Sequence, residues 1–183
     1  MTLFEFLMAL AAVVIAIGLS EIFGGWGHML RTRIVPKIDW LHLCWSVVVS
    51  LYAIQYWVGI WPYRVVEFTT IFQVWFLIFP TLFIVLVSFA ITPDIEPVEK
   101  QDLREYYMAR RAPIFLGLTV FVTMAQVADL VILGTSFSWI GMSLVAVLAI
   151  PAFTTNVWVH SIVLIFNSYF LVNNAIAPSI IGT

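Results

Sequence analysis

The feature that most constrains this chain is a series of apolar runs long enough to cross a lipid bilayer. A bilayer core needs about 20 apolar residues in an α-helix. The sequence offers six candidates, over residues 3–29, 40–60, 68–91, 113–133, 139–154 and 157–177. Lipid offers no hydrogen-bond partner to backbone N–H and C=O groups, so helices are expected. We therefore predict an all-α membrane protein, one domain over 1–183 with six transmembrane helices.

The fifth apolar run is the shortest, and it ends near Pro151. At about 1.5 Å per residue it barely crosses a bilayer. A tilted helix in a thinned bilayer and a re-entrant hairpin both fit this length.

The composition agrees with a membrane location and excludes nucleic-acid binding. The 183 residues are 63% hydrophobic and 10% charged, whereas a soluble domain averages about 25% charged residues. The eight Lys and Arg lie in loops, so no basic face is left to neutralise phosphates. Cys44 is the single cysteine, and we expect it to be a small buried apolar side chain.

The basic residues predict the orientation. The loop after the first run holds three of them and the loop after the third holds four, whereas the second loop holds only Arg64. The positive-inside rule then places both termini outside, with Trp57, Trp61 and Tyr63 as an outer aromatic belt. Residues 93–112 are expected to form a cytoplasmic loop, in which DLREYYMARR folds as a short amphipathic helix on the inner surface.

A 3+3 inverted repeat is suggested by two similar helix ends, FAITPDI and NAIAPSI. Glu21 in the first helix and Asp129 in the fourth also correspond. Two such units in tandem have the inverted topology that many transporters use.

Glu21 is the main candidate for a functional side chain. A carboxylate in hydrocarbon is costly, so we expect it to face protein or water. Gly18, Glu21, Gly25 and His28 share one helix face, and the glycines permit a close neighbour. A proton or cation site and a structural hydrogen bond are both open. The polar partner is expected from the second, fourth or sixth helix, with Ser46, Ser50, Asn167 and His160 at a suitable depth.

Two further polar stripes accompany Glu21. Gln126 and Asp129 follow one face of the fourth helix, although Asp129 is close enough to the outer end to reach the interface. In the sixth helix His160, Asn167 and Asn174 are seven residues apart and therefore align on one face. Such a face must meet other helices or water, either as inter-helix hydrogen bonds or as the lining of a polar pathway.

The three histidines are a further candidate ligand set. On the predicted topology His28, His42 and His160 all lie near the cytoplasmic face, where they could hold a metal or haem iron. No local ligand motif such as HxxxH, HExxH or a cysteine pair supports this, so no cofactor is predicted.

The segments LSEIFGGWGHMLR, WLHLCW, QYWVGIW and DLREYY resemble a family of small, uncharacterised bacterial multi-pass inner-membrane proteins. The resemblance covers about the first two thirds of the chain. It implies a bacterial inner-membrane location and carries no function.

Three functions stay open from the sequence. The first is a small transporter or channel with a polar site around Glu21, handling an ion, a proton or a small molecule. The second is a non-catalytic membrane subunit, sensor or accessory protein, and the third, less favoured, is a haem or quinone redox protein. The bilayer is the expected partner, and a homo-oligomer is left open.

Overall fold

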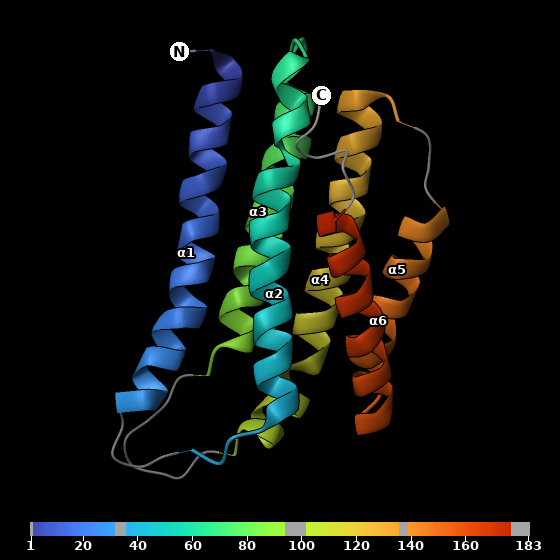
Figure 1. Cartoon of the computed structure of the whole chain (residues 1–183). Helices are drawn as coiled ribbons and strands as arrows, with labels where there is room; N and C mark the ends of the chain where they lie inside the picture. The colour runs from blue at the N-terminus through green and yellow to red at the C-terminus, as the bar shows by residue number, and fades with distance from the viewer. Residues whose placement is uncertain (1, 32–35, 94–101, 136–138, 177–183) are drawn as a thin grey trace.

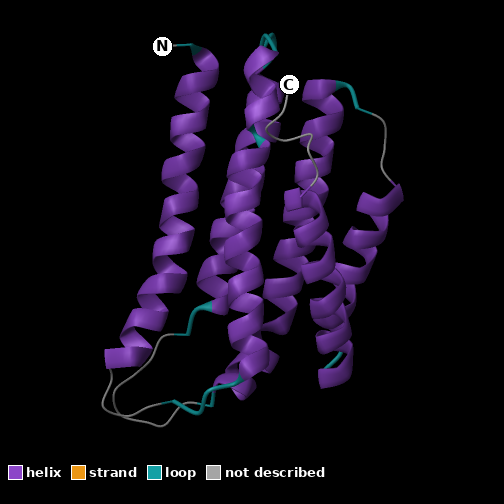
Figure 2. Cartoon of the chain, in the orientation of Figure 1, coloured by secondary structure: helices purple, strands orange, loops and turns teal. Residues whose placement is uncertain are grey.

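The structure is a computed structural model that describes residues 2–31, 36–93, 102–135 and 139–176. These residues form six α-helices that run side by side along one axis (Figures 1 and 2). The helices are α1 (Leu3–Arg31), α2 (Trp40–Gly59), α3 (Ile71–Ile91), α4 (Leu103–Leu133), α5 (Trp139–Ala149) and α6 (Val157–Ile176). Two short 3₁₀ helices, η1 (Trp61–Val65) and η2 (Ile150–Phe153), follow α2 and α5.

Four of the described helices are long and apolar enough to cross a membrane, namely α1, α2 together with η1, α3 and α4. The all-helical expectation is therefore confirmed, while the insertion and orientation of the helices stay predictions. The fifth segment is short, as expected: α5 has 11 residues before η2 begins. α6 has 20 residues.

We call the two ends of the bundle the basic end and the η1 end. The basic end holds residues 36–42, the C-terminal end of α3 and the first turns of α4 and α6, and it is at the bottom of Figure 1. The η1 end holds η1 and the start of α1, at the top of Figure 1. At the η1 end, α5 begins below the end of α4, and α6 ends below it as well. The bundle is therefore narrower at this end.

The amphipathic surface helix expected within 93–112 is not a separate element. Its residues from Leu103 onward are the first turns of α4, which continues through Pro113 for 31 residues. A proline inside a helix removes one backbone hydrogen bond. The turn before it is held by burial instead, because Leu103, Tyr107 and Ile114 are fully buried. Tertiary packing therefore overrides the helix break that the proline suggested.

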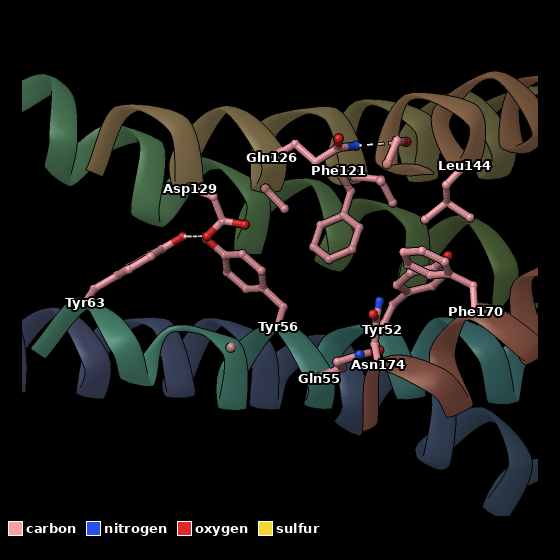
Figure 3. Close-up of a pocket in the computed structure, with 14 residues that line it drawn as sticks. Tyr52, Gln55, Tyr56, Tyr63, Phe121, Gln126, Asp129, Leu144, Phe170 and Asn174 are labelled. Carbon is pink, nitrogen blue, oxygen red and sulfur yellow. Dashed lines mark hydrogen bonds between the residues drawn. The ribbon is translucent and has the colours of Figure 1, made fainter. Parts of the chain in front are cut away.

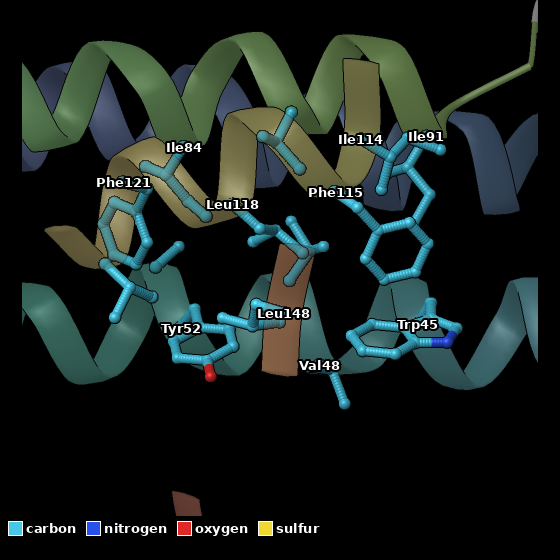
Figure 4. Close-up of a cluster of buried hydrophobic side chains, with 14 of the residues drawn as sticks. Trp45, Val48, Tyr52, Ile84, Ile91, Ile114, Phe115, Leu118, Phe121 and Leu148 are labelled. Atoms are coloured by element: carbon cyan, nitrogen blue, oxygen red, sulfur yellow. The ribbon is translucent and has the colours of Figure 1, made fainter. Parts of the chain in front are cut away.

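The main core lies between α2, α3, α4 and the α5–α6 pair (Figure 4). Trp45 of α2 packs edge-to-face on Phe115 of α4, with ring centroids 4.7 Å apart. Leu118 and Leu148 are fully buried beside them. In contrast, Cys44 is exposed on α2, so the expectation of a buried cysteine was wrong.

α1 is an edge helix that packs closely on α3. A Cβ added at Gly18 would lie 2.9 Å from Ser88 Oγ and 3.3 Å from Val85 Cα, and one at Gly25 would lie 2.5 Å from Thr92 Cγ2. Two of the glycines on the Glu21 face therefore permit close helix contact, as their spacing predicted.

Candidate functional site: a cavity between α2, α4, α5 and α6

A cavity of about 280 Å³ lies among α2, α4, α5 and α6 towards the η1 end (Figure 3). Three residues that the sequence singled out line it, namely Gln126, Asp129 and Asn174. Tyr52, Gln55, Tyr56 and Tyr63 line it as well, on α2 and η1. Most of the remaining lining is apolar and includes Phe121, Leu144 and Phe170.

Two helices of the cavity wall, α4 and α5, come close together at Gly141. Gln126 of α4 donates from Nε2 to the backbone oxygen of Gly141 in α5, at 3.1 Å. A Cβ at Gly141 would collide with the same amide group. A larger residue here would displace the Gln126 side chain and break its bond to Gly141, so this glycine makes room for the α4–α5 contact beside the cavity.

Asp129 is the carboxylate of the cavity. Tyr63 lies opposite it and donates its hydroxyl hydrogen to Asp129 Oδ1 at 2.7 Å, as Figure 3 shows. Within the described residues, Asp129 Oδ2 has no hydrogen bond, and neither of the two ion pairs found there includes Asp129. The arrangement leaves one carboxylate oxygen free to bind a group that enters the cavity.

The position of Tyr63 corrects the aromatic-belt assignment. Trp57 and Trp61 are exposed as a belt requires, but Tyr63 is buried and bonded to Asp129. Asp129 is half-buried against η1 and does not simply extend to the bundle surface.

Tyr56, which also lines the cavity, connects α2 to α3. Its hydroxyl donates to the backbone oxygen of Leu77 at 2.7 Å, and Leu77 lies one turn before Pro80 inside α3. This bond ties α2 to α3 close to the proline. The hydroxyl hydrogen of Tyr56 is therefore not available to a ligand, although its oxygen keeps free lone pairs. The ring of Tyr56 packs edge-to-face on Phe121, with centroids 5.6 Å apart.

Towards the basic end the cavity is followed by a closed contact between α2 and α6. Tyr52 donates to Asn167 Oδ1 at 2.6 Å, and Asn167 donates from Nδ2 to the Val163 oxygen at 2.8 Å. Asn167 is fully buried. The polar stripe of α6 thus faces the interior, as its spacing predicted, with Asn174 at the cavity and Asn167 below it.

His160, the third member of the stripe, forms a second closed contact at the basic end. Its Nε2 lies 2.9 Å from the backbone oxygen of Thr154, and its Nδ1 lies 2.6 Å from the Tyr107 hydroxyl. A carbonyl oxygen can only accept, so Nε2 carries the proton and Nδ1 accepts from Tyr107. Both ring nitrogens are used, and His160 is fully buried.

His42 of α2 also lies next to Tyr107. Its Nε2 donates to the Ile91 oxygen at 2.8 Å by the same argument, which satisfies a carbonyl at the end of α3. Its Nδ1 is buried without a partner among the described residues. The ring centroids of His42 and Tyr107 are 6.4 Å apart.

Two aspartates tie the starts of α2 and α4 together at the basic end. Asp39 caps α2 by accepting from the His42 backbone, and it pairs with Arg104 of α4 at 2.7 Å. Asp102 caps α4 and pairs with Lys37, which precedes α2, at 2.7 Å. Each cap is therefore bound to a cation next to the other cap. The hydrogen bond from Lys37 holds the pKa of Asp102 below its ordinary value.

Glu21 lies away from the cavity. It is half-buried on α1 and makes no hydrogen bond or ion pair with any described residue. The expected partners are engaged elsewhere. Ser46 and Ser50 donate to carbonyl oxygens of their own helix. Asn167 and His160 are bonded as described above, so the structure does not supply the polar partner that we expected for Glu21.

The three histidines do not form one ligand set. His28 is exposed at the end of α1, whereas the rings of His42 and His160 each contact Tyr107. No group of three or more His, Cys, Asp or Glu side chains gathers as a metal site in the described ranges.

Comparisons with protein-family models, curated proteins and solved structures give no match for this chain. The resemblance suggested by the sequence therefore stays a prediction, and function has to be argued from the site. The sequence missed the tyrosines of the cavity. Part of a signal was present, because Tyr52 and Tyr56 are four residues apart and share one face of α2, whereas Tyr63 lies in η1 beyond the end of that helix.

Proposed function

We propose that this chain is a small membrane carrier that takes a solute into the cavity around Asp129. The proposal keeps the transporter function favoured by the sequence and moves its polar site from Glu21 to Asp129. The observation that carries it is the half-buried carboxylate with a free oxygen, in a cavity of about 280 Å³ within an apolar bundle. Intramembrane carboxylates that face a cavity commonly mark substrate or ion sites.

The polar stripe of α6 supports a path beyond the cavity. Asn174, Asn167 and His160 follow one another at about 10 Å intervals along the helix, from a seven-residue rise each. The lower two are closed by the Tyr52–Asn167 and Tyr107–His160 hydrogen bonds. In this conformation the basic end is shut, and release there requires both contacts to open.

The accessibility of the cavity tests the proposal. Ala125 lines the cavity, whereas Ala128, less than one turn further along α4, is fully buried in the core. Each is changed to cysteine in a Cys44→Ser background and treated with a membrane-impermeant thiol reagent in proteoliposomes. We expect fast reaction at Ala125→Cys and little at Ala128→Cys. Equal reaction rates at the two positions would contradict a solvent-connected cavity and favour the accessory-subunit alternative.

The closed contacts can be tested with the same label. Tyr52→Phe combined with Tyr107→Phe removes both hydroxyls that hold α6 shut. We expect this double variant to admit reagent to Ala125→Cys from the basic end as well. Unchanged one-sided labelling in a well-folded double variant would contradict the carrier mechanism, because these contacts would then not be the closures.

A further inference from the structure

The lining of the cavity points to a ligand class. We infer that the solute is a small organic cation of the alkylammonium type, held by Asp129 and by the aromatic rings around it. This inference rests on the proposed function, because it names the substrate of the same cavity.

The negative charge of Asp129 favours a cationic ligand. Asp129 Oδ1 accepts from Tyr63, and Oδ2 has no partner within the described residues. A carboxylate in an apolar bundle is costly unless it is paired. Tyr63 supplies one hydrogen bond and no positive charge. A cationic ligand supplies the missing charge next to Oδ2, whereas an anionic ligand would be repelled.

The aromatic lining of the cavity also favours a cationic ligand. Three tyrosines and two phenylalanines border the cavity. Their ring faces attract a cation, and this mode of recognition suits quaternary ammonium groups in particular. The hydroxyls of Tyr52 and Tyr56 are already bonded to Asn167 and to the Leu77 oxygen. Because both hydroxyls donate their hydrogens within the protein, these residues offer a ligand ring surface and hydroxyl lone pairs, both of which suit a cation.

The same lining argues against a metal cation. Ca²⁺ and Mg²⁺ require about six or more oxygen ligands in a close shell. Apart from the Asp129 carboxylate, the lining side chains offer only neutral oxygens, from three amides and three tyrosine hydroxyls, so a divalent cation would keep an uncompensated charge. The volume also restricts the ligand, because ligand pockets usually measure about 300–1,000 Å³ and this cavity is at the lower limit.

Choline and its neutral isostere 3,3-dimethylbutan-1-ol form the test, because they have the same shape and differ in charge. Binding to purified protein in phosphatidylglycerol nanodiscs is measured by calorimetry. We expect choline to bind at least tenfold more tightly than the neutral isostere. We also expect Asp129→Asn to weaken choline binding at least tenfold while leaving the isostere unchanged. The control Glu67→Gln removes an exposed carboxylate after η1 and should bind choline normally.

The lipid composition of the nanodiscs distinguishes two sources of the ammonium group, a lipid headgroup and a free solute. If a lipid headgroup is the natural ligand, nanodiscs of phosphatidylethanolamine, whose headgroup carries an ammonium, will weaken choline binding by competition. Equal choline binding in the two lipids indicates a free solute. Folding of Asp129→Asn is checked by size-exclusion chromatography and circular dichroism, and Tyr63→Phe, which keeps the charge, should retain the preference for choline.

The outcomes distinguish the two proposals. Equal affinity for choline and the isostere, or no choline binding by protein whose Ala125→Cys variant is labelled, overturns the ammonium inference and leaves the cavity proposal standing. No labelling of Ala125→Cys overturns the cavity proposal itself.

Discussion

The two ends of the bundle use their buried polar groups differently. At the basic end three contacts pair these groups within the protein: Asp39 with Arg104, Tyr107 with His160, and His42 Nε2 with the end of α3, while His42 Nδ1 stays without a partner among the described residues. At the η1 end Asp129 has one hydrogen bond from Tyr63 and a free oxygen beside a cavity. Polar groups that satisfy one another hold helices together, whereas an incompletely paired carboxylate next to a cavity is available to a ligand. We therefore assign stability to the basic end and binding to the η1 end.

The largest expected difference in stability loss is between variants of Asp39 and Asp129. Asp39→Ala removes the cap of α2 and breaks an ion pair in which Asp39 is buried and Arg104 is 44% exposed, so we expect a loss of about 2 kcal/mol in the free energy of unfolding. Asp129→Asn keeps an acceptor for Tyr63, so a loss below about 1 kcal/mol is expected. Steric trapping in lipid discs measures both. An equal loss for the two variants would remove the distinction between the ends.

The Tyr107–His160 bond is expected to give the next largest effect. Tyr107→Phe leaves Nδ1 of a fully buried imidazole without a donor, which costs about 1–2 kcal/mol. In a double-mutant cycle with His160→Leu, the double variant should lose less than the sum of the single losses. Tyr169→Phe is the matched control, because Tyr169 is exposed on α6. Additive losses would show that the two side chains are not coupled.

Tyr52→Phe tests the boundary between the two regions. It removes the hydrogen donated to Asn167, and inter-helix hydrogen bonds in membranes average about 0.6 kcal/mol. We expect a stability loss of about that size, while Ala125→Cys stays protected from the basic end until Tyr107→Phe is added. Labelling of the single variant from the basic end would show that the Tyr107–His160 contact is not a closure.

The smallest effect concerns pH at the basic end. Lys37 lowers the pKa of Asp102 in the folded protein, so this carboxylate contributes stability above its unfolded pKa of 3.8. The contribution is lost as the pH falls below about 4 through the lowered folded pKa. The melting temperature of the parent protein should therefore fall more than that of Asp102→Asn over this range. Parallel curves would mean that the exposed pair contributes nothing measurable, as many surface pairs do.

Periodicity in the sequence predicted the helices and the buried face of α6. The seven-residue spacing of His160, Asn167 and Asn174 is a property of one helix, and a single helix is what a local pattern describes. The continuity of α4 through Pro113 was missed because it depends on the burial of Tyr107 and Leu103 by other helices. Packing between elements is not encoded in a local pattern.

The site was only partly predictable for the same reason. Asp129, Gln126 and Asn174 were identified by their polarity within apolar helices, and all three line the cavity. Glu21 has the same signal but lies on the edge helix α1, and no residue spacing indicates which helix becomes an edge. The tyrosines were missed because aromatic residues near a helix end also fit a membrane interface.

The reciprocal caps at the basic end have a consequence for synthesis of the chain. Both ion pairs join residues 65 positions apart, Asp39 with Arg104 and Lys37 with Asp102. At about 5–20 residues per second, the ribosome makes the later partner roughly 3–13 s after the earlier one. During that interval the start of α2 has no partner for Asp39 or Lys37. The start of α2 is therefore joined to α4 only after the fourth helix has begun to emerge, and the basic end is assembled later than the order of its residues suggests.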